Sequence, residues 1–149
     1  MESLGQKLRI TYYDASDGPR IVIFGPLDAD FQNLQQAFTQ LSQSPGETCE
    51  LHKQPFVASF GGTSLVLVCS GPMFGKKRDV VQGIRRVAGS TLPIFNWQRT
   101  AEGWDYLAEL ISSLVKSQTP GHQYLTRYPA EDAIVVVSKG EYGDDVLDR

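Results

Sequence analysis

Metal-ligating and nucleophilic side chains are scarce in this sequence. Its 149 residues include two cysteines and two histidines. Neither Cys49 nor Cys69 belongs to a CxxC pair, and no HxH or HExxH spacing occurs, which excludes the common signatures of a zinc site. The GxSxG pattern of a nucleophilic serine is also missing. We therefore assign no catalytic residue, no metal ligand and no cofactor from the sequence.

The two cysteines also bear on redox state. Both Cys49 and Cys69 lie in strand-like runs, where we expect reduced and partly buried thiols. A disulfide needs Cα atoms within about 7 Å, which adjacent strands would permit, so this alternative stays open.

Long apolar runs and a basic surplus are missing too. The longest apolar run, Leu65–Cys69, is far too short to span a bilayer, and the N-terminal MESLGQKLRI has no apolar signal core. We therefore expect a cytoplasmic protein that does not bind a membrane. The net charge is −3. Because phosphate contacts need an excess of lysine and arginine, we also expect no nucleic-acid partner.

What the sequence does contain in its first third is a strand pair and a helix. Leu8–Asp14 alternates apolar and polar residues, and Arg20–Gly25 is a second β-branched run across a short turn, which predicts a hairpin. The following apolar positions recur at steps of three and four, which predicts one apolar helix face. They are Phe31, Leu34, Phe38 and Leu41.

The middle of the sequence is less regular. TCELHKQPFVASF and TSLVLVCSG flank Gly61-Gly62 and predict a second hairpin, with Pro55 marking its first strand as an edge or bulged strand. Residues 76–88 have the helical spacing Val80, Val81, Ile84, Val87 and Ala88, which predicts a helix that Gly83 weakens.

The last third carries the strongest helix and strand patterns. After the extended stretch TLPIFNWQR, Thr100 can cap a helix whose apolar stripe runs from Trp104 to Val115. Ala133–Ser138 is a continuous apolar run suited to a central strand buried on both faces. Residues 140–149 form an acidic tail that we expect to be loose.

These patterns predict a single α+β domain over residues 1–149. Paired strands with segregated helices favour an antiparallel or mixed sheet of about five strands, covered by two to three helices. The repeated strand–helix alternation that a doubly wound α/β fold requires does not occur.

Two segments resemble phosphate-binding sites in part but depart from the required patterns. Gly71–Lys77 has the position of a phosphate loop, but it is one residue too short between its glycines, and Lys77 stands where the Walker pattern requires serine or threonine. The basic run KKRDVVQGIRR lacks interleaved aromatic residues for stacking on bases. A plain loop and a solvated face explain both.

Candidate binding residues come from two segments near the C-terminus. Trp97 and Arg99 precede the strong helix and are of the residue types that anchor protein interfaces, whereas Trp104 lies on the apolar stripe and is assigned to the core. The link from His122 to Asp132 has more aromatic and charged residues than a connector requires. The full candidate set is Trp97, Arg99, His122, Tyr124, Arg127, Tyr128, Asp132 and Glu141.

The segment from Pro93 to Tyr142 resembles a set of small bacterial α+β proteins. In these, a tryptophan-containing helix is followed by a Gly-His-x-Tyr-Leu segment, here Gly121–Leu125, and by a final strand that ends near Glu-Tyr. Some of these families are grouped with the immunity proteins of polymorphic toxin systems. The resemblance implies a small cytoplasmic binding protein whose partner is a toxin-type enzyme, and it brings no catalytic residues.

Three functional hypotheses follow. The first is a non-catalytic protein-binding module that resembles an immunity-type inhibitor. The second is a small-molecule-binding or enzymatic domain that uses His122 with Arg99, Glu102 or Asp132, and a polar-lined pocket containing His122 would favour it. The third is a homodimeric subunit joined through the strand near Pro55 or through the Trp97 segment.

Overall fold

The computed structural model describes residues 5–16, 18–70, 83–126 and 132–148. The strands are β1 (Leu8–Ala15), β2 (Gly18–Gly25), β3 (Thr48–Glu50), β4 (Val57–Ser59), β5 (Ser64–Ser70), β6 (Gly83–Arg86), β7 (Ile94–Thr100), β8 (Gly121–Tyr124) and β9 (Ile134–Lys139). The helices are α1 (Phe31–Ser42) and α2 (Ala101–Lys116), with two short 3₁₀ helices, η1 (Leu51–Lys53) and η2 (Asp144–Asp148).

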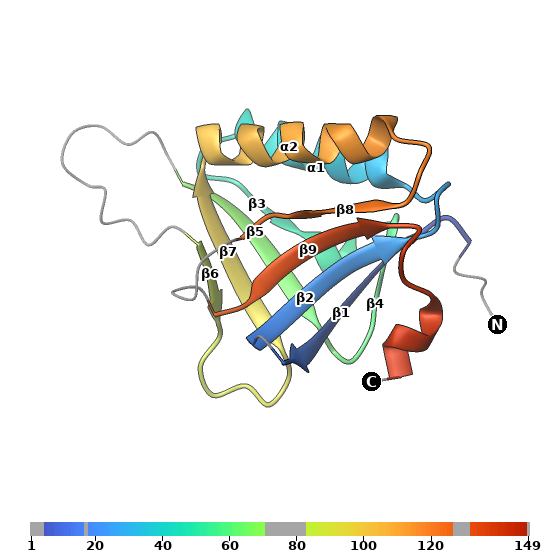
Figure 1. Cartoon of the computed structure of the whole chain (residues 1–149). Helices are drawn as coiled ribbons and strands as arrows, with labels where there is room; N and C mark the ends of the chain where they lie inside the picture. Colours follow the sequence, from blue (N-terminus) through green and yellow to red (C-terminus); the bar gives the residue numbers. More distant parts are fainter. Residues whose placement is uncertain (1–4, 17, 71–82, 127–131, 149) are drawn as a thin grey trace.

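The described strands form two mixed sheets, and the two helices lie side by side across one end of them (Figure 1). The five-stranded sheet has the order β4-β1-β2-β9-β8, and the four-stranded sheet has the order β3-β5-β7-β6. The predicted α+β class is therefore confirmed. We expected one sheet of about five strands, and the second sheet is an addition to that expectation.

A single large core joins both sheets and both helices. Buried side chains such as Ile10 and Val135 come from the five-stranded sheet, Leu65 and Trp97 come from the four-stranded sheet, and Leu107 comes from α2. Each element contributes the apolar side of its own pattern to this cluster. The core therefore fixes the positions of the outward-facing side chains on the opposite face of the five-stranded sheet.

The predicted first hairpin and central strand are confirmed. β1 and β2 pair antiparallel, and β9 lies between β2 and β8, parallel to the former and antiparallel to the latter. Val135 and Val137 of β9 face the large core, while Val136 is buried on the opposite face. A run of consecutive apolar residues is thus required because both faces of this strand are covered.

The predicted second hairpin is wrong. β3 pairs with β5, as expected, but the chain breaks at η1 and continues into β4, which pairs with β1 in the other sheet. Pro55 lies in this break, and both β3 and β4 are edge strands, which agrees with the edge position inferred from the proline. The Gly61-Gly62 turn, with positive φ at both residues, therefore connects the two sheets.

The predicted helix over residues 76–88 is wrong where the structure describes it. Gly83–Arg86 is strand β6, which pairs antiparallel with β7 and sets Ile84 opposite Trp97. Pairing with β7 buries the Ile84 side chain completely. The remaining part of the prediction, residues 76–82, lies outside the described residues.

Helix α2 is confirmed and is held at both ends. The Thr100 side chain accepts a hydrogen bond from Gly103 N at 3.1 Å, so the predicted N-cap is present. At the other end, the buried Lys139 of β9 donates from Nζ to the carbonyl oxygens of Leu114 and Ser117, each at 2.7 Å. A cation at the negative end of the helix dipole is favourable, so this lysine ties α2 to the five-stranded sheet.

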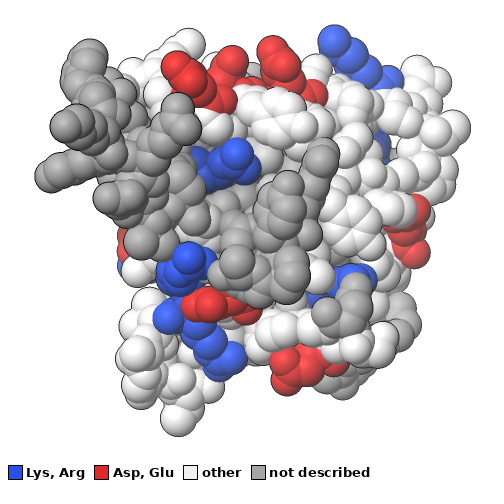
Figure 2. Space-filling model, turned by 60° about the vertical axis from the view of Figure 1, so that its left-hand side comes forward, with Lys and Arg blue, Asp and Glu red and all other residues white. Residues whose placement is uncertain are grey.

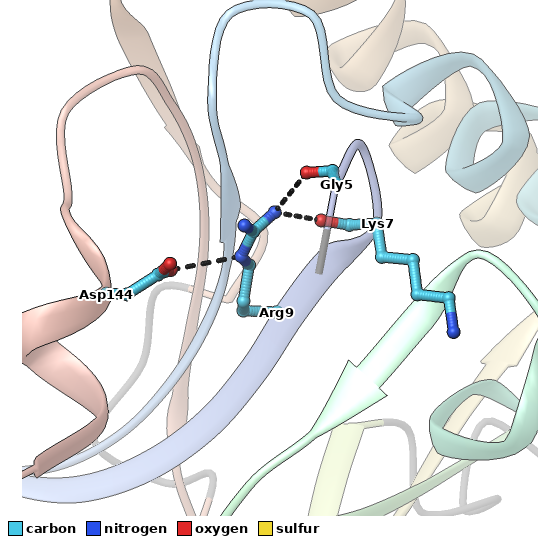
Figure 3. A network of polar contacts seen from close by, with 4 residues as sticks. All are labelled: Gly5, Lys7, Arg9 and Asp144. Carbon is cyan, nitrogen blue, oxygen red and sulfur yellow. Dashed lines mark hydrogen bonds and ion pairs between the residues drawn. The ribbon is translucent and has the colours of Figure 1, made fainter. Parts of the chain in front are cut away.

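The acidic tail, which we expected to be loose, lies against the outer face of the five-stranded sheet. Val146 of η2 is buried and contacts the apolar cluster formed by Val22, Phe24 and Val136. Beside it, Arg9 Nε lies 3.0 Å from Asp144 Oδ1, and the same guanidinium donates to the carbonyl oxygens of Gly5 and Lys7 (Figure 3). The tail therefore covers one half of this face.

Neither helix that the structure describes has the length and apolar character needed to cross a lipid bilayer.

Candidate functional site

The outer face of the five-stranded sheet carries tyrosines and an arginine next to the apolar cluster that the tail covers. Strand pairing sets Tyr13 opposite Arg20, Arg20 opposite Ile134, and Tyr124 opposite Val136. Because residues opposite one another in paired strands share a face, and side chains two apart do as well, these side chains project from the same face as Val136. They lie on four adjacent strands of one sheet.

We define the tyrosine–arginine face as Tyr13, Arg20, Tyr124 and Tyr142. The Arg20 guanidinium carbon lies 5.9 Å from the centre of the Tyr124 ring, within cation–π range. Burial raises the pKa of Tyr142, with smaller raising effects from Tyr13 and Tyr124 and a lowering effect from Arg20, so all four groups lie within electrostatic range. Tyr124 is 44% exposed and is the most accessible aromatic side chain of the set.

A hydrogen-bonded histidine borders this face. His122 Nδ1 lies 2.9 Å from Glu141 Oε1, and the Ser138 hydroxyl donates to the same oxygen at 2.7 Å. The Ser138 hydroxyl holds the pKa of the Glu141 carboxyl below its ordinary value of 4.5; the contact with His122 adds to this, and partial burial opposes it. The carboxylate fixes the orientation of the imidazole ring, and no hydrogen bond to Nε2 occurs among the described residues.

An open depression of about 520 Å³ lies next to this histidine. It is lined by His122, Gln123, Tyr124, Thr126 and Ile134. The volume falls within the range of about 300–1,000 Å³ that is usual for binding pockets. The lining mixes an aromatic ring, an aliphatic side chain, an imidazole, an amide and a hydroxyl, so it can take an apolar group and fix it with a few hydrogen bonds.

We expect Glu141→Gln to weaken the dependence of stability on acid pH. The pKa of Glu141 is lower in the folded protein than its ordinary value of 4.5, so its contribution to stability is present above pH 4.5 and is lost as the pH falls through the folded-state value. The free energy of unfolding of the wild type should therefore fall more steeply below pH 4.5 than that of the variant. Denaturant titrations over a pH series measure both slopes.

The control for this experiment is Glu109→Gln, which changes an exposed glutamate of α2. Its pH profile should follow that of the wild type. If Glu141→Gln and Glu109→Gln give the same acid-range slope, the hydrogen bonds that Glu141 accepts do not favour its ionised form.

Trp97 and Arg99 are not part of this surface. Trp97 is 0% exposed and packs against Phe38 and Trp104, because its alternation in β7 turns it toward the core. Its side chain is therefore not accessible to a partner in this structure. The partly buried Arg99 side chain lies against Gly103 at the start of α2, where any larger residue would collide with the guanidinium group.

Asp132 joins the two sheets. Its Oδ2 accepts a hydrogen bond from Arg86 N at 2.8 Å, and its own N–H donates to Ile84 O at 3.1 Å. These bonds occupy the outer edge of β6 and give Asp132 a structural role. The other two candidates of this link, Arg127 and Tyr128, lie outside the described residues.

The structure thus brings together three of the sequence candidates, His122, Tyr124 and Glu141, and adds three residues that sequence reasoning missed. These are Tyr13, Arg20 and Tyr142, which lie near the two ends of the chain. The signal for Tyr13 and Arg20 was the polar side of the alternation in β1 and β2, and Tyr142 belongs to the Glu-Tyr pair at the end of the resemblance.

Charged side chains of both signs are distributed over the side of the molecule shown in Figure 2. Acidic residues gather along part of its upper edge, and acidic and basic residues lie among one another lower on the same face. Helix α2 supplies Glu102, Asp105 and Glu109, which are exposed and spaced as one helix face. The described basic residues in this view form no continuous band of the kind that tracks a nucleic-acid backbone.

The cysteines and the other potential metal ligands do not form a reactive centre in the described part of the chain. Cys49 and Cys69 are both free, and burial raises the pKa of each thiol, with a further raising effect of Glu50 on Cys49. Both thiols are thereby kept in the less nucleophilic protonated form. Among the residues described, no three His, Cys, Asp or Glu side chains lie close enough to hold a metal ion.

Comparisons of this chain with protein-family models, with curated proteins and with solved structures found no match.

Proposed function

We propose that this protein is a binding module for another protein, and that the partner contacts the tyrosine–arginine face. The observation that carries the proposal is the grouping of Tyr13 and Tyr124 with Arg20 on one face of a sheet, with Tyr142 packed against Phe24 on the same face. Tyrosine and arginine are enriched among the residues that dominate binding energy at protein interfaces.

The sheet holds the tyrosine–arginine face rigidly, which favours binding to the surface of another protein. Tyr13, Arg20 and Tyr124 project from paired strands whose other side is anchored in the core, so they lose little conformational freedom on binding. Tyrosine adds a large contact area with only two side-chain torsions to restrict. The neighbouring depression can accept a projecting side chain of the partner.

The resemblance to immunity proteins suggests what such binding would do. A partner of the toxin-enzyme type would be inhibited because the bound module covers its active site or an adjoining surface. The net charge of −3 is compatible with a basic partner. This assignment leads to a direct measurement, since the activity of the purified partner should fall in proportion to the amount of module added.

The test uses two exposed tyrosines. Tyr124 is 44% exposed on the proposed face, and Tyr106 is 47% exposed on a different element, α2. Partners captured from an extract of the source cells are purified and titrated calorimetrically against Tyr124→Ala, Tyr106→Ala and the wild type. We expect at least about a tenfold weaker affinity for Tyr124→Ala, as for a residue that contributes strongly to an interface, and no change for Tyr106→Ala.

Equal affinities of the two variants for every purified partner would show that the tyrosine–arginine face is not the binding surface. Loss of binding in Tyr106→Ala alone would move the site to the exposed face of α2.

A second candidate function rests on the depression beside His122. Glu141 binds Nδ1 of His122, so the other ring nitrogen, Nε2, is left to exchange a proton with a small molecule bound in the depression. Arg99, Glu102 and Asp132, the partners expected for His122, are not among the described residues that line the depression, and Glu141 bonds to the histidine in their place. A small-molecule screen that monitors the His122 ring resonances tests this, and a hit must lose affinity in His122→Gln.

A further inference from the structure

Strand β8 is an end strand of the five-stranded sheet. It pairs with β9 on one side, and no strand in the described part of the chain pairs with its other side. An edge of this kind exposes backbone donors and acceptors that can pair with another extended chain. The edge borders both the tyrosine–arginine face and the depression.

The register identifies which backbone groups point outward. Leu125 N donates to Val135 O at 2.8 Å, so this pair is hydrogen-bonded across β8 and β9. Because hydrogen-bonded and non-hydrogen-bonded pairs alternate in an antiparallel ladder, Gln123 also bonds to β9, whereas the N–H and C=O groups of His122 and Tyr124 point away from it.

Strand β6 shows how such outward groups are satisfied elsewhere in this protein. It is the end strand of the four-stranded sheet, and its outward Ile84 C=O and Arg86 N–H are both taken by Asp132. No described residue does the same for His122 or Tyr124. The β8 edge therefore differs from the β6 edge in lacking an internal cover among the described residues.

The space beside β8 is hollow. The depression is lined by His122 and Tyr124 and also by Gln123, whose side chain projects to the other face and donates to Ser113 of α2. Because three consecutive residues of β8 line it, the depression follows this strand. Its volume of about 520 Å³ leaves room for another chain at this position.

We propose that β8 receives an extended segment of the partner protein as an additional strand. This proposal rests on the proposed function and specifies how the partner binds. The outward N–H and C=O groups of His122 and Tyr124 pair with the backbone of the segment, and one of its apolar side chains enters the depression beside Ile134. Backbone pairing supplies affinity, and the depression selects the side chain.

Charge and size disfavour a second copy of this chain as the occupant. Two copies paired through β8 about a two-fold axis would bring both Glu141 carboxylates, each held against His122 of β8, toward the same junction, and each chain has a net charge of −3. Four paired residues on each side also give a contact far smaller than the roughly 1,200 Å² that a stable interface buries. A neutral or basic segment of another protein avoids the repulsion.

Amide hydrogen exchange of the protein alone is the first measurement. The amides of His122 and Tyr124 should exchange much faster than those of Gln123 and Leu125, which bond to β9. If His122 and Tyr124 are as well protected as their neighbours, their backbone groups are already occupied and the proposal is overturned.

The second measurement uses a displayed library of short random peptides as the probe. Peptides selected on the wild type are titrated against His122→Pro and His122→Ala. Both variants lose the imidazole, but only proline removes the outward N–H, and an edge strand tolerates proline at such a position. We expect His122→Pro to bind at least about tenfold more weakly than His122→Ala.

Methylating the peptide nitrogens one at a time should weaken binding at every second position of the peptide. This measurement uses the wild-type protein, so it does not depend on how a variant folds.

Three results would overturn the proposal: no enriched peptide, equal binding by the two variants, or no alternation in the methylation series. A concentration-dependent dimer that is lost in His122→Pro would instead assign the edge to a second copy. A partner that loses affinity for Tyr124→Ala but binds His122→Pro and His122→Ala equally would leave the proposed function intact while removing strand addition.

Discussion

Replacing Phe38 by alanine is expected to lower the free energy of unfolding by about 3–5 kcal/mol, the usual cost of removing a buried aromatic ring. The Phe38 side chain is 0% exposed and lies on the core face of α1. Its ring centre is 6.2 Å from that of Trp97 and 5.3 Å from that of Trp104, so one side chain links α1 to the four-stranded sheet and to α2. Alanine would leave a cavity between two large rings that cannot easily close.

Denaturant unfolding followed by tryptophan fluorescence measures this loss. The matched control is Phe38→Leu, which retains most of the apolar volume and should lose much less stability than the alanine variant. Both tryptophans border the cavity, so the emission of folded Phe38→Ala should also change. A loss in Phe38→Ala no larger than that in Phe38→Leu would show that the helices are not fixed through this aromatic cluster.

Replacing Lys139 by methionine is expected to lower the free energy of unfolding by about 2–4 kcal/mol, since two charge-assisted hydrogen bonds are lost and their acceptors stay largely buried. Lys139 is 5% exposed, and its Nζ bonds to Leu114 O in the last turn of α2 and to Ser117 O just after it. Methionine fits the space of the aliphatic stem but cannot donate. Leu114 O would keep only the bond from Ser117 N, Ser117 O would lose its bond to the lysine, and the end of α2 would be free to fray.

Lys116→Met is the control, because Lys116 is an exposed lysine in the same last turn of α2. Its loss should fall within about 0.5 kcal/mol of zero, as for most surface substitutions. Hydrogen exchange at the end of α2 separates fraying from global destabilisation. Similar losses in the two variants would mean that the buried lysine is no more important to the helix end than a solvated one.

The helices and strands that were predicted correctly are those in which the pattern of apolar residues within one segment determines which residues are buried. Helix α2 repeats apolar residues with one period over four turns, and Thr100 marks its start, so its prediction was confirmed. Strand β9 was also predicted, because a short run rich in β-branched valine favours a strand covered on both faces. In both, the residues that decide the structure are neighbours in the chain.

The secondary-structure predictions that were wrong concern segments whose structure depends on pairing with a strand that is distant in the sequence. Ile84 and Val87 have helical spacing, but Gly83–Arg86 is a strand because β7 is available to pair with it. Likewise, the run around Pro55 reads as one strand, yet its two halves bond to different sheets. Short apolar runs are compatible with either structure until their partner is known.

The candidate site shows the same limit. His122, Tyr124 and Glu141 were singled out because they lie within one segment of the sequence. Tyr13 and Arg20 were not, since nothing near them indicates that the C-terminal strands will lie beside β2. Their grouping depends on the register of four strands, and periodicity within one strand says nothing of that register.

The position of β9 in the sheet also has a consequence for how the protein folds. β1 and β2 can pair early, because they are adjacent in the chain, but the other side of β2 is completed only by β9 near the opposite end of the chain. Contacts between such distant segments slow folding. On the ribosome, β2 therefore remains an open edge until β9 has been synthesised, and the nascent chain is exposed to aggregation through this edge during that interval.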